Sequence, residues 1–237
     1  MSKKEGLLKR AWNVLLRRGP VSIGKIVMIR LAHFVFEHHE GYILERDLNE
    51  PIDQFEAQTP CECKFLDDET EIDQLLAVQP KRTREIIQDR LAAGKLCNIV
   101  KVGDKIVHVT WGDSGDVYLP NPSGRVFGKK KVVTFPEGYV YREGSYTPPE
   151  ERRKGYSKAS SSFSFGAIRD LGFHTAIATV ACKNIPMLRG MVLFKYLLKK
   201  KVTYVRVLGI KFRKVEDVTW DDAPPEVRDY AARTPRR

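Results

Sequence analysis

The sequence contains few cysteines and lacks a long uninterrupted apolar run. Its 4 cysteines among 237 residues are too few and too scattered for a disulfide framework, so we predict reduced thiols. The longest apolar stretch, from Val21 to Phe36, is interrupted by Lys25 and Arg30 and is shorter than the ~20 residues that cross a bilayer. Residues 3–20 mix leucines with basic side chains, which is not the pattern of a secretory signal. We therefore expect a cytoplasmic protein without a membrane span.

Acidic residues are outnumbered by basic ones. Lysine and arginine total 41 against 30 acids, which gives a formal charge of +11. An acidic partner is expected, but nucleic acid, an anionic membrane and a phosphate-bearing cofactor all satisfy this requirement. With 42% hydrophobic and 30% charged residues, the composition is that of a globular protein. It excludes disorder, collagen and coiled coil as descriptions of the whole chain.

Residues 1–50 are predicted to form an N-terminal extension. Apolar side chains recur there at helical spacing, opposite basic residues, until Gly19-Pro20 stops the pattern: Leu7, Leu8, Trp12, Leu15 and Leu16. This indicates a basic amphipathic helix. A second helical pattern covers residues 21–36, and residues 41–47 resemble a short strand. The extension either packs against the main domain or attaches to a partner or to the anionic inner surface of the membrane.

Residues 51–216 are predicted to form a mixed domain of strands and helices. The expected strands cover residues 61–66, 96–102, 105–111, 138–145 and 175–181, and Gly103-Asp104 indicates a hairpin between the second and third of them. Helical patterns cover residues 71–78, 83–93, 156–171 and 185–198. Residues 112–131 predict a long loop of the kind that borders a site. Residues 202–215 predict a strand pair or one bent strand, and residues 217–237 a polar, loosely held tail.

The stretch from Gly138 to Ser157 predicts a strand, a basic turn and the start of a helix. Amides at a helix N-terminus lack internal partners and lie at the positive end of the helix dipole, so they can bind a phosphate. Gly155 would permit close approach of the backbone, and Arg152, Arg153 and Lys154 add positive charge. The same pattern also fits an ordinary strand-to-helix connection.

Two motifs in this region resemble landmarks of the GNAT acyltransferase superfamily. Arg152, Gly155 and Ser157 match its coenzyme A signature, in which Arg or Gln, two variable residues, Gly, one variable residue and Gly or Ala follow the fourth core strand. The preceding Pro149-Glu150-Glu151 is similar to the family's lead-in. About 30 residues later, the segment from Lys183 to Arg189 resembles the helix start after the fifth strand, which begins at Asn184. The resemblance covers residues 60–215.

The resemblance implies an α+β fold: a mixed, twisted sheet flanked by helices, here preceded by the N-terminal helical extension. In that fold the fourth and fifth strands splay apart and coenzyme A enters between them. By resemblance, Asn184 belongs to the cofactor site, and Ser145, Tyr146 and Thr147 lie along the pantetheine arm. The diphosphate would be held, together with the signature's Arg152, by Arg153, Lys154, Gly155, Tyr156 and Ser157. A main-chain amide would polarise the thioester carbonyl, and the acceptor amine would attack directly, without a metal.

The sequence departs from the family pattern in two places. Ser157 stands where the signature has Gly or Ala, a small change. Met191 stands where the family carries a tyrosine as general acid, and a thioether cannot donate a proton. Tyr196 and Tyr146 are the remaining candidates for the acid. Glu143 is the candidate base, with two alternatives: it is a solvated strand carboxylate, or water accepts the proton.

We expect an acetyl-CoA dependent N-acyltransferase that acts on a primary amine of a small molecule such as an amino sugar or amino acid. One alternative is a long-chain N-acyltransferase at the membrane, and another is a catalytically silent coenzyme A binding module. The scattered positive charge contains no nucleic-acid reading motif, so nucleic acid is not expected as a partner. Cys61 and Cys63 have no second ligand pair at zinc spacing, so no metal is expected.

Overall fold

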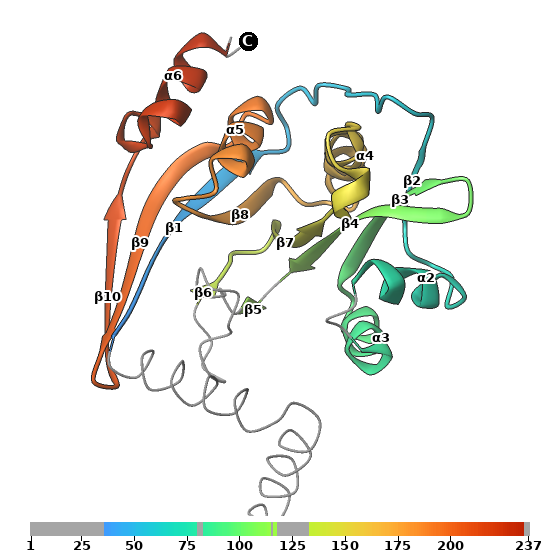
Figure 1. Ribbon diagram of the computed structural model, residues 1–237, viewed down its shortest axis with the longest axis horizontal. Helices are drawn as coiled ribbons and strands as arrows, with labels where there is room; N and C mark the ends of the chain where they lie inside the picture. The colour runs from blue at the N-terminus through green and yellow to red at the C-terminus, as the bar shows by residue number, and fades with distance from the viewer. Residues whose placement is uncertain (1–35, 80–82, 115, 118–132, 235–237) are drawn as a thin grey trace, which may run out of the picture. The chain divides into compact units, whose positions relative to one another are not determined.

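The computed structural model describes residues 36–79, 83–114, 116–117 and 133–234 (Figure 1). The chain divides into two compact units. One comprises residues 1–40 and 202–215, and the other comprises residues 41–201 and 216–237. The helix predicted from Leu7 to Leu16, residues 21–35 of the second predicted helix and most of the predicted loop at 112–131 lie outside the described residues, whereas Phe36 is the first residue of a strand. The candidate site lies wholly within the larger unit.

The strands form an 8-stranded sheet in the order β10-β9-β1-β8-β7-β4-β3-β2. Their bounds are β1 Phe36–Asp47, β2 Glu62–Phe65, β3 Leu96–Val102, β4 Lys105–Ser114, β7 Tyr139–Tyr146, β8 Thr175–Ala181, β9 Leu197–Val207 and β10 Ile210–Asp217. A separate short pair joins β5 (Asp116–Val117) to β6 (Val133–Thr134). β7 and β8 pair in parallel, whereas β1 pairs with β8 and β4 with β7 in antiparallel fashion. The sheet is therefore mixed, as predicted.

Helices cover both faces of the sheet in the larger unit (Figure 1). α4 (Tyr156–Asp170), α5 (Ile185–Leu193) and α6 (Pro225–Arg233) contribute apolar side chains to one core cluster, with Phe165, Leu188 and Val227 among its most buried members. α2 (Glu71–Val78) and α3 (Arg84–Ala92) cover β3 and β4 on the opposite face, in a second cluster around Trp111. Burial of these two apolar faces is the main stabilising contribution to the fold.

The periodic segments fold as the sequence predicts. α2, β3 and β8 have the predicted bounds, and α3 begins after Thr83, whose side chain accepts a hydrogen bond from the Ile86 amide. The positive φ of 56° at Gly103 forms the predicted turn between β3 and β4. These segments are specified by local patterns of apolar residues and by turn chemistry.

The helix predicted over residues 185–198 is too long. α5 ends at Leu193, Lys195 adopts a positive φ of 58°, and the chain enters β9 at Leu197. The Tyr196 amide donates to the Met191 carbonyl, which closes the helix end. No glycine announces this stop, because a lysine occupies the left-handed position. The apolar run up to Leu198 is therefore shared between a helix and a strand.

Segments near both ends of the larger unit contribute to its core. β1 lies inside the sheet between β8 and β9, with Leu44 and Leu48 fully buried. The tail is not loosely held: Val227 of α6 is completely buried and Trp220 is 6% exposed. Pro225 occupies the first turn of α6, where proline is favoured.

A connector, residues 48–61, runs from β1 to β2 across α4. The Phe55 amide donates to the Ser162 hydroxyl at 3.0 Å, and this hydroxyl donates to the Asp53 carbonyl at 2.9 Å. The Gln58 amide donates to the Lys154 carbonyl at 2.9 Å. Small hydroxyl side chains on α4 therefore let the connector lie close to the helix and to the turn that precedes it. Among the described residues, no helix combines the length and apolarity needed to cross a bilayer.

Candidate active site

β7 and β8 run side by side for a short distance and then part. Their parallel pairing extends from Tyr139 with Thr175 to Arg142 with Ala178. Beyond this point residues 143–146 of β7 stay in the ladder with β4, and residues 179–181 of β8 pair with β1. Beyond Arg142, the facing edges of β7 and β8 do not pair with each other. Such edges are the backbone surface to which an extended ligand can add as a strand.

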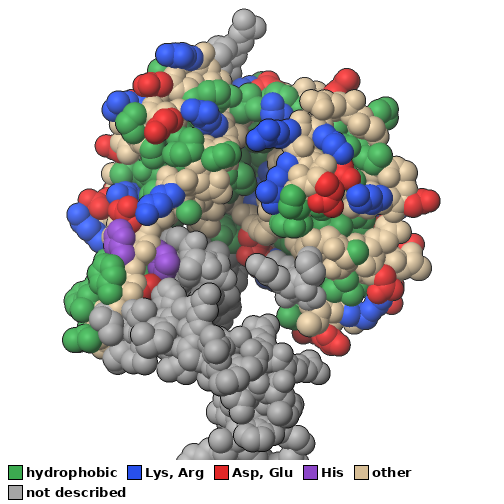
Figure 2. All heavy atoms as spheres, viewed as in Figure 1, with side chains coloured by type: hydrophobic (Ala, Val, Ile, Leu, Met, Phe, Trp, Pro, Cys, Tyr) green, Lys and Arg blue, Asp and Glu red, His purple; other side chains and the backbone are tan. Residues whose placement is uncertain are grey.

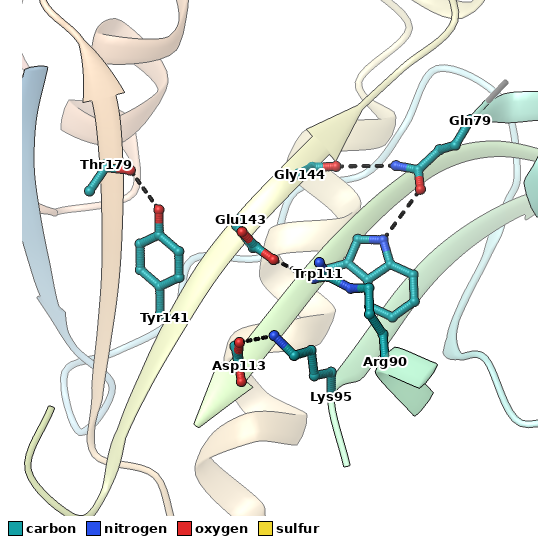
Figure 3. A network of polar contacts seen from close by, with 9 residues as sticks. All are labelled: Gln79, Arg90, Lys95, Trp111, Asp113, Tyr141, Glu143, Gly144 and Thr179. Atoms are coloured by element: carbon teal, nitrogen blue, oxygen red, sulfur yellow. Dashed lines mark hydrogen bonds and ion pairs between the residues drawn. The ribbon is translucent and has the colours of Figure 1, made fainter. Parts of the chain in front are cut away.

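A hydroxyl pair marks the point where the strands separate. The hydroxyl groups of Tyr141 on β7 and Thr179 on β8 lie 2.6 Å apart and form a hydrogen bond (Figure 3). Tyr141 is 1% exposed, and burial raises its pKa above the ordinary value for tyrosine. The hydroxyl therefore remains neutral at physiological pH, and its hydrogen bond holds β7 and β8 together immediately before they diverge.

A β-bulge follows on β7. Trp111 lies opposite Glu143 and Val109 opposite Tyr146, so two steps along β4 correspond to three along β7. Gly144 adopts the positive φ of 62° that such an irregularity requires. Its carbonyl accepts a 3.4 Å hydrogen bond from Gln79, whose oxygen accepts from the Trp111 indole at 3.4 Å. The bulge takes Gly144 and Ser145 out of the regular ladder between β4 and β7.

Glu143 is a positioned carboxylate and not a freely solvated one. It forms an ion pair with Arg90 of α3, and the Arg90 guanidinium lies 4.3 Å from the centre of the Trp111 ring (Figure 3). The Glu143 and Arg90 side chains are 21% and 15% exposed. A carboxylate fixed in this way, beside the point where the strands separate, is positioned to accept a proton.

The turn between β7 and α4 presents a row of backbone amides. A short 3₁₀ turn covers Pro149–Glu151, Arg153 and Gly155 adopt positive φ values of 67° and 88°, and α4 begins at Tyr156. The amides of residues 153–157 donate no hydrogen bond to an acceptor among the described residues. Alternating conformations of this kind before a helix N-terminus gather N–H groups into an anion-binding concavity.

Basic side chains surround this turn, and part of their charge is already neutralised. The carboxylate of Glu151 forms ion pairs with Lys105 and Lys154, at 2.7 and 2.8 Å. These two hydrogen bonds lower the pKa of Glu151 and raise that of each lysine. Arg152 donates through Nε to the Thr147 carbonyl at 3.1 Å. Arg152 and Arg153 are both exposed, so their charge faces solvent beside the unpaired amides.

Gly155 has a structural role that the sequence does not reveal. A Cβ atom at this position would lie 3.1 Å from the Ala57 Cα and 3.3 Å from the Glu56 carbonyl oxygen. Glycine is therefore needed both for the positive φ and for contact with the connector. The space beside its Cα is taken by the protein's own backbone, so close approach of a cofactor to this Cα is not what the glycine provides.

The second landmark lies at the start of α5. The Asn184 side chain is the N-cap of α5 and accepts a hydrogen bond from the Met187 amide at 3.3 Å. Tyr196 lies beyond this helix, is 2% exposed and packs 6.0 Å from the Phe165 ring. Burial raises the pKa of its hydroxyl, while the charges of Arg142 and Arg46 oppose that increase. The structure therefore gives Asn184 a capping role and encloses Tyr196 in the core.

Tyr146 and Thr147 are anchored by their surroundings. The Tyr146 ring packs against the cluster beneath α2. The Thr147 hydroxyl lies 2.7 Å from Nδ1 of His108, a residue that sequence reasoning missed. His108 is 1% exposed and also contacts the Thr110 hydroxyl at 3.0 Å. Burial, aided by the Arg142 charge, lowers the pKa of His108 to about 3, so it is neutral at physiological pH.

A sequence signal for His108 was present. Polar His108 and Thr110 alternate with Val107, Val109 and Trp111 along β4, which places two polar side chains on one face of a buried strand. Such side chains need partners when buried. Arg90 carried no comparable signal, because its contact with Glu143 depends on how α3 packs on the sheet.

An open cavity of about 830 Å³ lies beside the end of β7. Its walls come from α2, the β3–β4 hairpin and the chain after β7, including Val78, Ile106, Tyr146 and Pro149. This cavity lies on the side of β7 that faces β4, so it is distinct from the gap that opens where β7 and β8 separate. Among the described residues, no group of three His, Cys, Asp or Glu side chains has the arrangement of a metal site.

Comparisons with known proteins agree with this architecture. The sequence matches no protein-family model and no curated protein. Among solved structures, it resembles a GCN5-related N-acetyltransferase from Sphaerobacter thermophilus, with TM-score 0.51 and 11% identity over 81% of this chain and 58% of that one. A GCN5-related glucosamine N-acetyltransferase region of a fungal multi-domain β-N-acetylglucosaminidase gives TM-score 0.50 and 11% identity over 79% of this chain and 23% of that one.

A third structure, from Novosphingobium aromaticivorans and assigned to the GNAT family, gives TM-score 0.48 and 11% identity over 71% of this chain. The chain spans 63% of its length, so it covers less than two thirds of each of the three structures. The two structures with TM-scores of 0.51 and 0.50 confirm the predicted α+β fold, which is the fold of GCN5-related N-acetyltransferases. At such low identity they show the fold and leave the activity to be argued from the site.

Proposed function

We propose that this chain is an acyl-CoA dependent N-acyltransferase that transfers an acetyl group to a primary amine of a small molecule. The observation that carries the proposal is the continuous arrangement on β7. The strand leaves its parallel neighbour at Arg142, bulges at Gly144 and leads into the unpaired amides of residues 153–157. This arrangement supplies, in order, an edge for an extended arm and a cradle for its diphosphate.

Each group has a role in the proposed reaction. The amides of residues 153–157 bind the diphosphate, and the positive charge of Arg152 and Arg153 strengthens that binding. The pantetheine arm lies along residues 145–147. A backbone amide freed by the bulge donates to the thioester carbonyl oxygen and stabilises the developing oxyanion, an effect worth roughly 2.7 to 4 kcal/mol for one well-placed donor.

Proton transfer completes the proposal. Glu143 accepts the proton of the acceptor ammonium, directly or through one water molecule, so that the neutral amine attacks the carbonyl carbon. The C–S bond then breaks and the coenzyme A thiolate is protonated. Tyr146 is the candidate donor of that proton, because Tyr196 is enclosed in the core beneath α4 and Met191 has no acidic proton.

The binding step is tested by isothermal titration of the full chain with acetyl-CoA. We expect saturable binding that weakens when Arg152 and Arg153 are replaced by glutamine. A Lys183→Gln variant, which changes an exposed charge before α5, should bind as the unaltered chain does. A well-folded chain that does not bind acetyl-CoA would refute the proposal.

The chemical step is tested by release of free thiol with a panel of primary amines. The panel includes amino acids and glucosamine, the amine for which the fungal structural neighbour is named. Turnover of acetyl-CoA should exceed turnover of a long-chain acyl-CoA. The reverse ratio would favour the long-chain transferase instead.

A catalytically silent coenzyme A binding module is the second candidate. It is favoured by Met191 at the position where the family carries its tyrosine acid, together with the burial of Tyr196. This candidate predicts tight coenzyme A binding, and no thiol release above the rate of spontaneous hydrolysis with any amine in the panel.

A further inference from the structure

The hairpin formed by β9 and β10 ends in an unusual turn within the smaller unit. Two residues connect the strands, Leu208 and Gly209, and both have positive φ, 48° and 81°. Two-residue turns with this geometry favour Asn-Gly, because asparagine and glycine tolerate the left-handed conformation. A leucine there is strained by its Cβ. The local backbone therefore does not explain why position 208 is a leucine.

Packing does not explain it either. Leu208 and Ile210 are 62% and 63% exposed, Phe212 is 56% exposed, and Val207 is 39% exposed. Figure 2 shows apolar side chains gathered at this end of the hairpin, at the lower left. Isolated exposed apolar residues are common, but a run of them over a strained turn indicates a surface that contacts a partner. We call residues 207–212 the hairpin tip.

The charge around the hairpin tip has one sign. Residues 202–215 contain Arg206, Lys211, Arg213 and Lys214 and no acidic residue. Arg206 is paired with Glu37 of β1 at 3.0 Å, whereas the exposed side chains of Lys211 and Arg213 form no ion pair with another described residue. A second copy of the same hairpin would bring like charges together, so charge complementarity selects an anionic partner.

We propose that the hairpin tip docks on an anionic lipid surface. Val207, Leu208 and Ile210 enter the boundary between headgroups and acyl chains, and Lys211 and Arg213 contact the headgroup phosphates. The chemistry of the turn favours lipid over nucleic acid. Val207, Leu208 and Ile210 are aliphatic and suit the acyl region, and Phe212 is the one aromatic side chain of the hairpin tip on which a base could stack. This inference is independent of the proposed acyl transfer.

The test measures sedimentation of the full chain with vesicles of phosphatidylcholine containing phosphatidylglycerol, and with vesicles of phosphatidylcholine alone. The informative variant is Leu208→Asn with Ile210→Thr. Asparagine suits the left-handed turn and threonine suits a strand, so the hairpin should be retained. We expect the partition coefficient on the anionic vesicles to fall by roughly tenfold.

Two further variants sharpen this test. Leu171→Asn removes a leucine of similar exposure, 57%, from the end of α4 and should leave partition unchanged. Lys211→Gln with Arg213→Gln should weaken partition by roughly fivefold for each charge removed, and added salt should reduce this difference. Circular dichroism spectra confirm that each variant is folded.

Three results would overturn the proposal. The folded chain fails to bind the anionic vesicles at low salt, or the Leu208→Asn/Ile210→Thr variant binds them as well as the unaltered chain. The third is a gel shift with duplex DNA or single-stranded RNA that depends on residues 208 and 210 while vesicle binding does not. Tenfold loss in that variant, with Leu171→Asn unaffected, would support it.

Discussion

The chain contains two strand-to-helix junctions that both match short family motifs in the sequence. In the structure, the backbone amides at the two junctions differ in their hydrogen bonding. Before α4, the amides of residues 153–157 have no acceptor among the described residues, and exposed arginines lie beside them. Before α5, the Asn184 side chain already accepts from the Met187 amide, and Pro186 in the first turn has no amide to offer. A helix N-terminus is available to an external anion only when the protein has not capped it. The first junction is therefore the stronger candidate for anion binding, and the Asn184 side chain caps the helix at the second.

The largest expected effect is at Gly155. A Gly155→Ala substitution forces a Cβ into a left-handed position, at a cost of about 1 to 2 kcal/mol, and against the backbone of the connector. We expect acetyl-CoA affinity to fall by at least tenfold, together with lower stability in urea. Gly190 of α5 has nothing within 4 Å of an added Cβ, so Gly190→Ala should stabilise the chain by up to about 1 kcal/mol. Equal effects of the two substitutions would remove the contrast between the junctions.

Lowering the pH should decrease the free energy of unfolding, because acid protonates the buried His108 near the first junction. Its folded-state pKa of about 3 lies below the ordinary value of 6.5, so the unfolded chain binds more protons between these two values. The free energy of unfolding therefore rises with pH across this window and falls as pH is lowered. We expect a loss of about 2 kcal/mol between pH 7 and pH 5 from this group, measured by urea unfolding.

A His108→Gln variant isolates that contribution. Over the same interval, this variant should show a shallower dependence of the free energy of unfolding on pH than the unaltered chain. If the His108 variant keeps the full slope, the buried neutral imidazole is not its source.

A substitution at Asn184 distinguishes a role as helix N-cap from a role as cofactor contact. As an N-cap, Asn184→Ala should lower stability by about 1 kcal/mol and leave acetyl-CoA affinity within about twofold. As a cofactor contact, which the family resemblance implies, it should lower affinity and leave stability nearly unchanged. Urea unfolding and titration on the same preparation separate these outcomes.

The smallest effect is expected at Tyr196. Because this side chain is enclosed in the core and burial raises its pKa, Tyr196→Phe should change kcat by less than about twofold between pH 6 and pH 9. Removal of a general acid typically costs 10²-fold or more. A loss of that size in a variant with unaltered stability would restore Tyr196 as the acid.

Local patterns predicted much of this fold, and contacts between distant segments decided the rest. The periodicity of residues 71–78 and 175–181 was sufficient for α2 and β8. The bulge at Gly144 depends on the register between β4 and β7, and the Arg90–Glu143 ion pair depends on packing of α3. Neither follows from the spacing of residues along the chain. For the same reason the sequence could not show that Gly155 packs against the connector.

The turn before α4 and the helix start before α5 looked equally informative in the sequence, because both match short motifs. A motif specifies residue types and does not specify the hydrogen-bond partners of those residues. In the structure, the Asn184 side chain accepts a hydrogen bond from an amide of its own helix. Gly155 and Arg153 instead adopt conformations that leave amides unpaired. Whether each backbone N–H group finds an acceptor depends on the folded structure, and the sequence alone does not show it.

The most direct measurement is an amide NMR titration of the full chain with coenzyme A. If the first junction holds the diphosphate, the amide resonances of Gly155, Tyr156 and Ser157 shift strongly and saturate with the binding isotherm, while those of Ile185, Met187 and Leu188 do not move. Saturable binding that shifts the α5 resonances and leaves residues 155–157 unchanged would contradict the account.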